Sequence, residues 1–396
     1  MVIEIDKSVT LDQIDTYYDR LVRAEEVDAP VDLLLPMKLD NHFGGLVPAL
    51  LQFVITWSRY PHAGHLLLNI QQPDEVNFRE VLENELLFPA IILVWFKTDI
   101  YNSTGDIDLR SYLKDPLGDL RDLMMKVRPM KGNKLMLVSI DHFPFASGGL
   151  PLFETPDSFI DNEASTMRNL KPALESVLSF SQEAKREFAL YGKDFIKIIH
   201  ELFKNTHEWA RTDYNNIAVN PGIRGILVKF FKKRRQSILQ EYKWHTGLRE
   251  YFESKVHTEN QQEELYFVEI SVFDSGVGFV EKFEAPDKNE ISDIEIIKRC
   301  LMLHMTSSKS LEKDEKGVGL DKILQILSSK GLIRIKTNAR CVYRNMITHP
   351  YKFVEKEQDL DLFDWKNNSL TNYSSLHQAA GACLTILYPL STKAHS

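Results

Sequence analysis

The chain has 396 residues, 43% of them apolar and 26% charged, which is the composition of a globular protein with enough core-forming material for two domains. Its net charge of -8 argues against a general nucleic-acid coat. The cysteines Cys300, Cys341 and Cys383 form no C-x-x-C pair, which excludes a zinc knuckle and argues against a disulfide scaffold. We therefore expect a protein of the reducing cytoplasm.

No membrane segment is expected. The stretch MVIEIDKSV at the start has early acids and no apolar region, so it does not have the pattern of a signal peptide. The most apolar segment, 86–96, has eleven residues, whereas a helix that crosses a bilayer needs about twenty. We interpret it as buried core.

The first half of the chain alternates short apolar runs with helical patterns. Helices are expected at 10–26, 44–60 and 78–88, the last ending at Pro89, and strands at 2–5, 31–37, 65–70, 90–96 and 134–143. This alternation predicts an α/β layer with parallel pairing, within a domain over residues 1–165. The pattern resembles a STAS-like domain, which implies regulatory contact with a protein. An α/β domain that senses a partner in its own way is the alternative.

The second half has a different order of elements. A loop region at 143–165 and a helical linker at 166–190 precede a second domain at 191–392, with an insertion at about 233–262. Helices are expected at 195–211, 291–303 and 319–331, and strands at 222–235, 265–273, 332–338 and 383–390. This order predicts helices on one face of a mixed or antiparallel sheet, which is an α+β sandwich.

The helix at 195–211 carries an acid and an amide four residues apart. Glu201 and Asn205 therefore lie on one face of that helix. An amide oxygen is a hard ligand for Mg²⁺, and a carboxylate can orient or deprotonate water. The same spacing also occurs on ordinary solvated helix faces.

A strand at 265–273 ends in Asp274-Ser275-Gly276-Val277-Gly278. An aspartate at a strand end can accept a hydrogen bond from an exocyclic amine, and glycines let a flat ligand approach the backbone. Taken alone, the stretch is also ordinary turn chemistry.

A third stretch, Thr306-Ser307-Ser308-Lys309-Ser310, is followed by Lys-Gly-Val-Gly-Leu at 316–320 and then by a helix. Glycines at the start of a helix can seat phosphate on backbone N–H groups. The polar residues between the two stretches suit a lid, and a flexible loop before a capped helix is the alternative.

In this order, the three stretches resemble the Bergerat-fold ATP-binding domain of the GHKL superfamily. That superfamily includes gyrase and other type II topoisomerases, ninety-kilodalton heat-shock chaperones, mismatch-repair ATPases and histidine kinases. Residues 201–210 resemble its N box, 274–278 and 317–320 its two glycine boxes, and 381–390 its last strand. The resemblance covers about 190–392.

The resemblance implies ATP and Mg²⁺ as ligands and assigns a role to each matched residue. Asp274 would bind the adenine amino group with Thr385 behind it, and Gly276 and Gly278 would make room for the nucleotide. Asn205 would hold Mg²⁺. Gly317 and Gly319 would face the phosphates, with Lys309 as a lid contact. Glu201 would be the catalytic base, because superfamily members that hydrolyse ATP carry the form E-L-x-x-N-x-x-D/E-x-A, which residues 201–210 reproduce.

Two features depart from the superfamily pattern. About sixty residues separate the N box from the first glycine box, and the second glycine box is a single G-x-G. Both features bear on the lid more than on the adenine site. No Walker A sequence is present, so the chain is not a P-loop enzyme.

Three functions remain open at this point. The first is an ATPase whose lid closes on nucleotide and regulates a protein partner or a homodimer. The second is a protein kinase of the histidine-kinase or anti-sigma type, and the third is a nucleotide-binding interaction module with little turnover. Residues 166–200 are too few for a phosphoacceptor hairpin in addition to the N box, which disfavours the sensor kinase.

A basic cluster lies at the end of the stretch 222–235 and consists of Lys229, Lys232, Lys233, Arg234 and Arg235. Such a run can contact the phosphates of a nucleic acid. It also occurs at solvated strand ends, so nucleic acid remains a possible partner.

Overall fold

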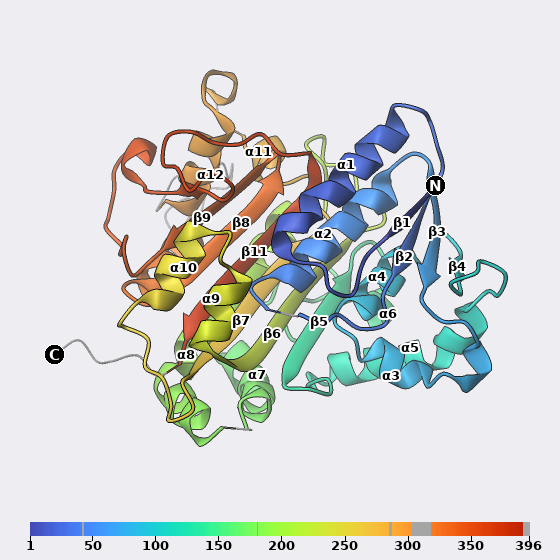
Figure 1. Cartoon of the computed structure of the whole chain (residues 1–396), viewed down its shortest axis with the longest axis horizontal. Coiled ribbons are helices and arrows are strands. Elements are labelled where there is room, and N and C mark those ends of the chain that lie inside the picture. Colours follow the sequence, from blue (N-terminus) through green and yellow to red (C-terminus); the bar gives the residue numbers. More distant parts are fainter. Residues whose placement is uncertain (42, 180, 285–286, 303–317, 391–396) are drawn as a thin grey trace.

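The computed structural model describes residues 1–41, 43–179, 181–284, 287–302 and 318–390. Two sheets organise the chain, and helices pack on both of them (Figure 1). One sheet is parallel and has four strands, whereas the other is antiparallel and has seven. The predicted α+β class is confirmed.

The smaller sheet is formed by the amino-terminal half. Its order is β1 (Val2–Glu4), β2 (Val31–Leu35), β3 (Ala63–Leu68) and β4 (Ile100–Tyr101), with every pair parallel. The helices of this half are α1 (Ile14–Glu25), α2 (Leu46–Arg59), α3 (Phe78–Leu82), α4 (Leu87–Val94) and α5 (Arg110–Met125). The predicted parallel layer is therefore confirmed.

One expected strand in this half is wrong, because residues 90–96 lie mostly in α4. Pro89 is the third residue of this helix, where its missing N–H leaves no helical hydrogen bond unmade. Every residue of α4 is buried, and a helix that is apolar on all sides is stable when it is fully enclosed. The β-branched residues of the run therefore pack in a helix.

The larger sheet has the order β10-β9-β8-β11-β7-β6-β5, and each described pair is antiparallel. Its strands are β5 (Lys134–Ile140), β6 (Ile223–Arg234), β7 (Glu264–Asp274), β8 (Leu332–Asn338), β9 (Arg340–Asn345), β10 (Phe363–Asp364) and β11 (Ala379–Pro389). The strand expected at 134–143 was assigned to the parallel layer, and that pairing is wrong. It lies antiparallel to β6 over its whole length, so the larger sheet begins before the loop region at 143–165.

Helices cover both faces of the larger sheet. On one face lie α8 (Gln182–Trp209), with α7 (Glu163–Val177) and α13 (Val318–Leu327) packed against it, and α12 (Asp293–Leu301) packed against α13. The other face is covered by α2 and by the insertion helices α9 (Arg235–Glu241) and α10 (Thr246–Glu253). The short helices α6 (Phe145–Gly148) and α11 (Phe279–Lys282) lie in connections.

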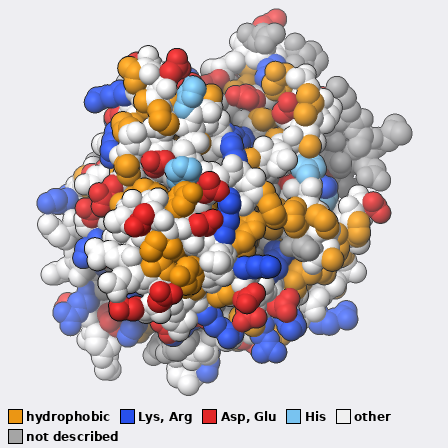
Figure 2. All heavy atoms as spheres, turned by 90° about the vertical axis from the view of Figure 1, so that its right-hand side faces the viewer, with side chains coloured by type: hydrophobic (Ala, Val, Ile, Leu, Met, Phe, Trp, Pro, Cys, Tyr) orange, Lys and Arg blue, Asp and Glu red, His pale blue; other side chains and the backbone are white. Residues whose placement is uncertain are grey.

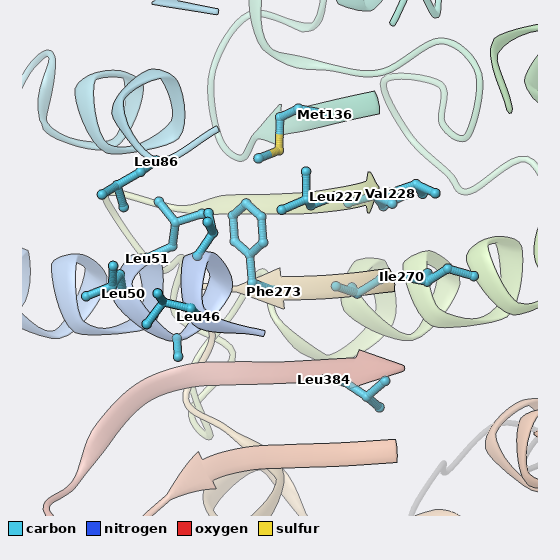
Figure 3. Close-up of a cluster of buried hydrophobic side chains, with 14 of the residues drawn as sticks. Leu46, Leu50, Leu51, Leu86, Met136, Leu227, Val228, Ile270, Phe273 and Leu384 are labelled. Carbon is cyan, nitrogen blue, oxygen red and sulfur yellow. The ribbon is translucent and has the colours of Figure 1, made fainter. Parts of the chain in front are cut away.

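Helices cover both faces of the larger sheet because its strands bury side chains on both faces. Phe195 of α8 packs on Tyr388 of β11, whereas Gly45 at the start of α2 lies against Thr385 of the same strand. Side chains three residues apart on a strand point to opposite faces. Apolar side chains of α2 and the central strands form the core that Figure 3 shows. The expectation of helices on one face missed α2, which comes from the amino-terminal half and lies between the two sheets (Figure 1).

Acidic and basic side chains are interspersed on the face of the molecule shown in Figure 2, with apolar side chains between them. Within the described part of the chain, no helix combines the length and the apolar character that a bilayer crossing requires.

Candidate functional site

The candidate site is built around the glycine turn, residues 274–278, at the end of β7. Asp274 is buried, and its Oδ1 accepts hydrogen bonds from the N–H groups of Gly276 at 2.8 Å and Ala382 at 3.2 Å. Its Oδ2 accepts no hydrogen bond from the described residues. Burial raises the pKa of Asp274 to about 6, although the two N–H groups and the charge of Arg59 oppose this shift. The turn therefore holds a carboxylate whose second oxygen is available to accept a hydrogen bond from a ligand.

Both glycines of the turn are required by close contacts. A Cβ atom at Gly276 would come within 2.7 Å of the Cα of Ala210, which follows α8. Gly278 has a φ of +85°, and a Cβ atom there would lie 2.7 Å from Thr337 Oγ1. Only glycine has no Cβ atom and adopts this φ without strain. The contact with Ala210 brings the predicted N box and the first glycine box together.

Glu201 and Asn205 lie beside the ion-paired face of α8, and the charge of Glu201 also acts on Lys204. Both are partly buried, and neither side chain is hydrogen-bonded to a described residue. The neighbouring face of the helix carries His200 and Lys204, which both bond to Asp161. An acid and an amide that make no hydrogen bond to the described residues are thus held on a helix that ends at the glycine turn.

The direction of α13 places its first residues near the end of the larger sheet where Asp274 lies. Lys330, just beyond the end of α13, lies over the rings of Tyr191 in α8 and Tyr388 in β11, at 4.3 and 4.7 Å. The strand that follows, β8, runs back to Asn338, whose amide donates to the Val277 carbonyl oxygen in the glycine turn. Because α13 is followed by a sharp reversal into β8, it begins at the end of the sheet where Asp274 lies.

The second glycine stretch is described only in part. Gly319 is the second residue of α13, which begins at Val318. Gly317, Lys309 and the predicted lid lie outside the described residues. Their proposed contacts with phosphate stay predictions.

Thr385 does not lie behind Asp274, so that expectation is wrong. In the register of β7 and β11, Asp274 lies next to Ala382, because Phe273 is opposite Cys383. Thr385 is opposite Ser271, and their hydroxyl groups are 3.0 Å apart on the face that α2 covers. The strand therefore supports Asp274 through a backbone N–H group and not through a threonine hydroxyl.

Sequence reasoning missed a buried ionic network beside the turn. Arg224 of β6 is the cross-strand neighbour of Asp274. Its guanidinium donates to Asp141 at 2.8 Å and to Glu154 at 2.7 Å. Burial alone would raise the pKa of Glu154, but His207 and Arg224 hold it well below the usual range. The continuous burial of the first residues of β6 encloses Arg224, and its acids come from a connecting segment that shows no periodic pattern.

The basic cluster is largely neutralised by neighbouring acids. Its ion pairs are Lys229 with Glu85, Lys232 with Glu264, Lys233 with Glu241, and Arg235 with Glu259. Lys229 is also buried. These pairs leave little of the cluster's charge for the phosphates of a nucleic acid.

No family model, no curated protein and no solved structure matches the chain. Among the described residues, no group of three or more histidine, cysteine, aspartate or glutamate side chains is placed to hold a metal ion. The geometry around Asp274 and α8 therefore carries the evidence for function.

Proposed function

We propose that the protein binds ATP with Mg²⁺ in its carboxy-terminal half and hydrolyses it. The observation that carries this proposal is the contact of Gly276 with Ala210. This contact sets the buried Asp274 and the helix that bears Glu201 and Asn205 at one end of the sheet. The resemblance to Bergerat-fold ATPases rests on the same residues.

The adenine end of the proposed site suits its ligand chemically. The second carboxylate oxygen of Asp274 accepts no hydrogen bond from the described residues, and an exocyclic amine is a donor that matches it. Because neither Gly276 nor Gly278 has a side chain, a flat base can approach the backbone of the turn. Guanine presents a carbonyl oxygen at this place, which could not form a hydrogen bond with the carboxylate oxygen of Asp274 because both groups are acceptors.

The phosphate end would use α8 and the start of α13. The N–H groups at the first turn of α13, including that of Gly319, favour an anion. Asn205 would supply an amide oxygen to Mg²⁺, which would neutralise charge on the phosphates. Glu201, one helical turn earlier, would accept the proton of the attacking water. Gly317 and Lys309 complete this end in the sequence prediction.

Regulation of a protein partner or a homodimer by closure of the predicted lid belongs to the same proposal. The kinase alternative has less support, because His200 beside Glu201 is buried and hydrogen-bonded to Thr166 and Asp161. The cysteines are free thiols, with Cys341 and Cys383 buried. This supports our proposal of a reducing cytoplasmic location.

The direct test is binding of ATP to the full chain by calorimetry, with and without Mg²⁺. We expect Asp274→Asn to abolish binding, because the amide presents a different set of donors and acceptors to the adenine. Asp157→Asn is the matched control, since Asp157 is exposed. Wild-type affinity in the Asp274 variant would refute the proposed adenine site. Transfer of a radiolabelled phosphate stably to protein would favour the kinase alternative.

A further inference from the structure

A polar stripe on α2 contacts the backbone around the glycine turn. Gln52, Thr56 and Arg59 follow each other at spacings of four and three residues, so they share one face of this helix. Most of the helix is apolar and packs in the core. Three polar side chains on one face of such a helix require partners, because a buried polar group without a hydrogen bond is costly.

Gln52 and Thr56 bond to the strand that lies beside Asp274. The side-chain amide of Gln52 donates to the carbonyl oxygens of Gly381 at 3.3 Å and Lys336 at 3.2 Å. The hydroxyl oxygen of Thr56 accepts the N–H of Ala380 at 3.0 Å. The helix thus fixes the start of β11, which supplies the Ala382 N–H to Asp274.

Arg59 reaches the glycine turn itself. Its Nη1 donates to the carbonyl oxygen of Gly276 at 3.0 Å, and the same oxygen accepts the N–H of Gly381 at 2.8 Å. The charge of Arg59 also favours the ionised form of Asp274. One residue of the amino-terminal half therefore contacts the backbone of the turn and acts on its carboxylate.

The contact borders a groove between the two halves. This groove has a volume of about 330 Å³ and is lined by Tyr18 and Tyr60 on one side and by Val277 and Glu281 on the other. Arg59 lies in its wall, and the second terminal nitrogen of its guanidinium, Nη2, is buried without a hydrogen bond. The space beside Arg59 is therefore not filled by the described side chains, and the guanidinium has a donor to spare.

We propose that α2 couples the amino-terminal half to the nucleotide site, with Arg59 as the positioning residue that sets the geometry and charge of the glycine turn. This inference rests on the proposed function and gives the amino-terminal half a task within it. A partner or ligand that displaces α2 would change the affinity for ATP. By linkage, ATP would change the affinity for that partner by the same factor.

The experiment compares Arg59→Met, Arg59→Lys and the control Arg23→Met, all in the full chain. Arg23 is exposed on α1, so its variant measures the effect of the same substitution away from the turn. The dissociation constant for ATP is measured from pH 5 to pH 8, and the melting temperature is measured in parallel. Titration of the phosphates is common to all variants, so differences between variants report on the protein.

We expect Arg59→Met to weaken ATP binding about tenfold at pH 7, because a charged hydrogen bond to the turn is lost. The midpoint of its pH dependence should move upward, because Asp274 loses a favourable charge. Arg59→Lys keeps the charge and should restore the midpoint with a smaller loss of affinity. Arg23→Met should match the wild type in both measurements.

Three results would count against parts of this account. Wild-type protein that binds no ATP would overturn the proposed function together with the inference. Wild-type binding with unchanged affinity and midpoint in both Arg59 variants would overturn only the inference. Equal losses of affinity in both variants, with a lowered melting temperature and an unmoved midpoint, would reduce Arg59 to a structural role and also overturn it.

Discussion

Gly276 lies so close to Ala210 that a methyl group at position 276 would come within 2.7 Å of the Ala210 Cα atom. This contact joins the end of α8 to the glycine turn. The near atom belongs to the backbone, so a side chain cannot simply move aside to relieve the overlap. Any residue other than glycine at 276 has to push the turn and the helix apart.

Gly276→Ala should therefore weaken ATP binding by at least tenfold and lower the melting temperature. Gly118→Ala is the matched control, since a Cβ atom there meets nothing within 4 Å and Gly118 lies inside α5. That control should raise the free energy of unfolding by about 0.5–1 kcal/mol, because alanine favours a helix over glycine. Unchanged ATP affinity in Gly276→Ala would separate the turn from the nucleotide site.

The burial of Asp274 predicts that ATP binding and the free energy of unfolding make opposite demands on this side chain. Its pKa is 3.8 in an ordinary setting and about 6 in the fold. Because the folded state holds the proton more tightly, the contribution of this group to stability falls as the pH rises from about 4 through 6. Two pKa units correspond to roughly 3 kcal/mol. Asp274→Asn should therefore raise the free energy of unfolding at pH 8 while it abolishes ATP binding.

Urea unfolding at pH 8 and at pH 4 measures this effect. The stabilisation by Asp274→Asn should be largest at pH 8 and should nearly vanish at pH 4, where the wild-type side chain is neutral in the folded protein. Asp157→Asn should change neither value. A less stable Asp274→Asn protein at pH 8 would show that the ionised side chain is well solvated or paired.

Much of this site could be predicted from sequence because its parts are local. The alternation of β7 predicted a strand that ends at Asp274, and the spacing of Glu201 and Asn205 predicted one helix face. Those features depend on residues close together in the chain. Their assembly depends on tertiary contacts, and the ordered set of motifs indicated it only through resemblance.

Features that depend on strand register could not be predicted in this way. Thr385 was expected behind Asp274, but a shift of one residue along a strand moves a side chain to the other face. The strand β9 was missed because Arg340 and Arg344 interrupt its apolar pattern. The structure pairs Arg340 with Asp293 and gives Arg344 the carbonyl oxygen of His349. The helix α4 was misjudged because burial outweighed the strand propensity of its β-branched residues.

Arg224 should be among the most sensitive positions of the fold. Replacing it by methionine would remove the buried guanidinium that pairs with both Asp141 and Glu154, and would leave them only their weaker cationic neighbours. Removing one partner of a buried ionic network typically costs about 3–5 kcal/mol. Arg79→Met is the control, because Arg79 pairs with Asp119 at the surface and should cost less than about 1 kcal/mol. Equal losses in the two variants, measured by urea unfolding, would contradict the importance assigned to the network.

Glu201→Gln should separate ATP binding from hydrolysis. Glutamine fills the same space and keeps the helix, so the dissociation constant for ATP should stay within about twofold of the wild type. The amide cannot accept the proton of a water molecule, and the loss of a general base typically lowers turnover by about 10²–10⁴-fold. Glu175→Gln, an exposed site on α7, is the control and should leave both values unchanged. Single-turnover measurements with radiolabelled ATP report the chemical step directly. Undiminished hydrolysis in Glu201→Gln would remove this residue as the base, whereas loss of binding would place it in contact with the nucleotide or its metal ion.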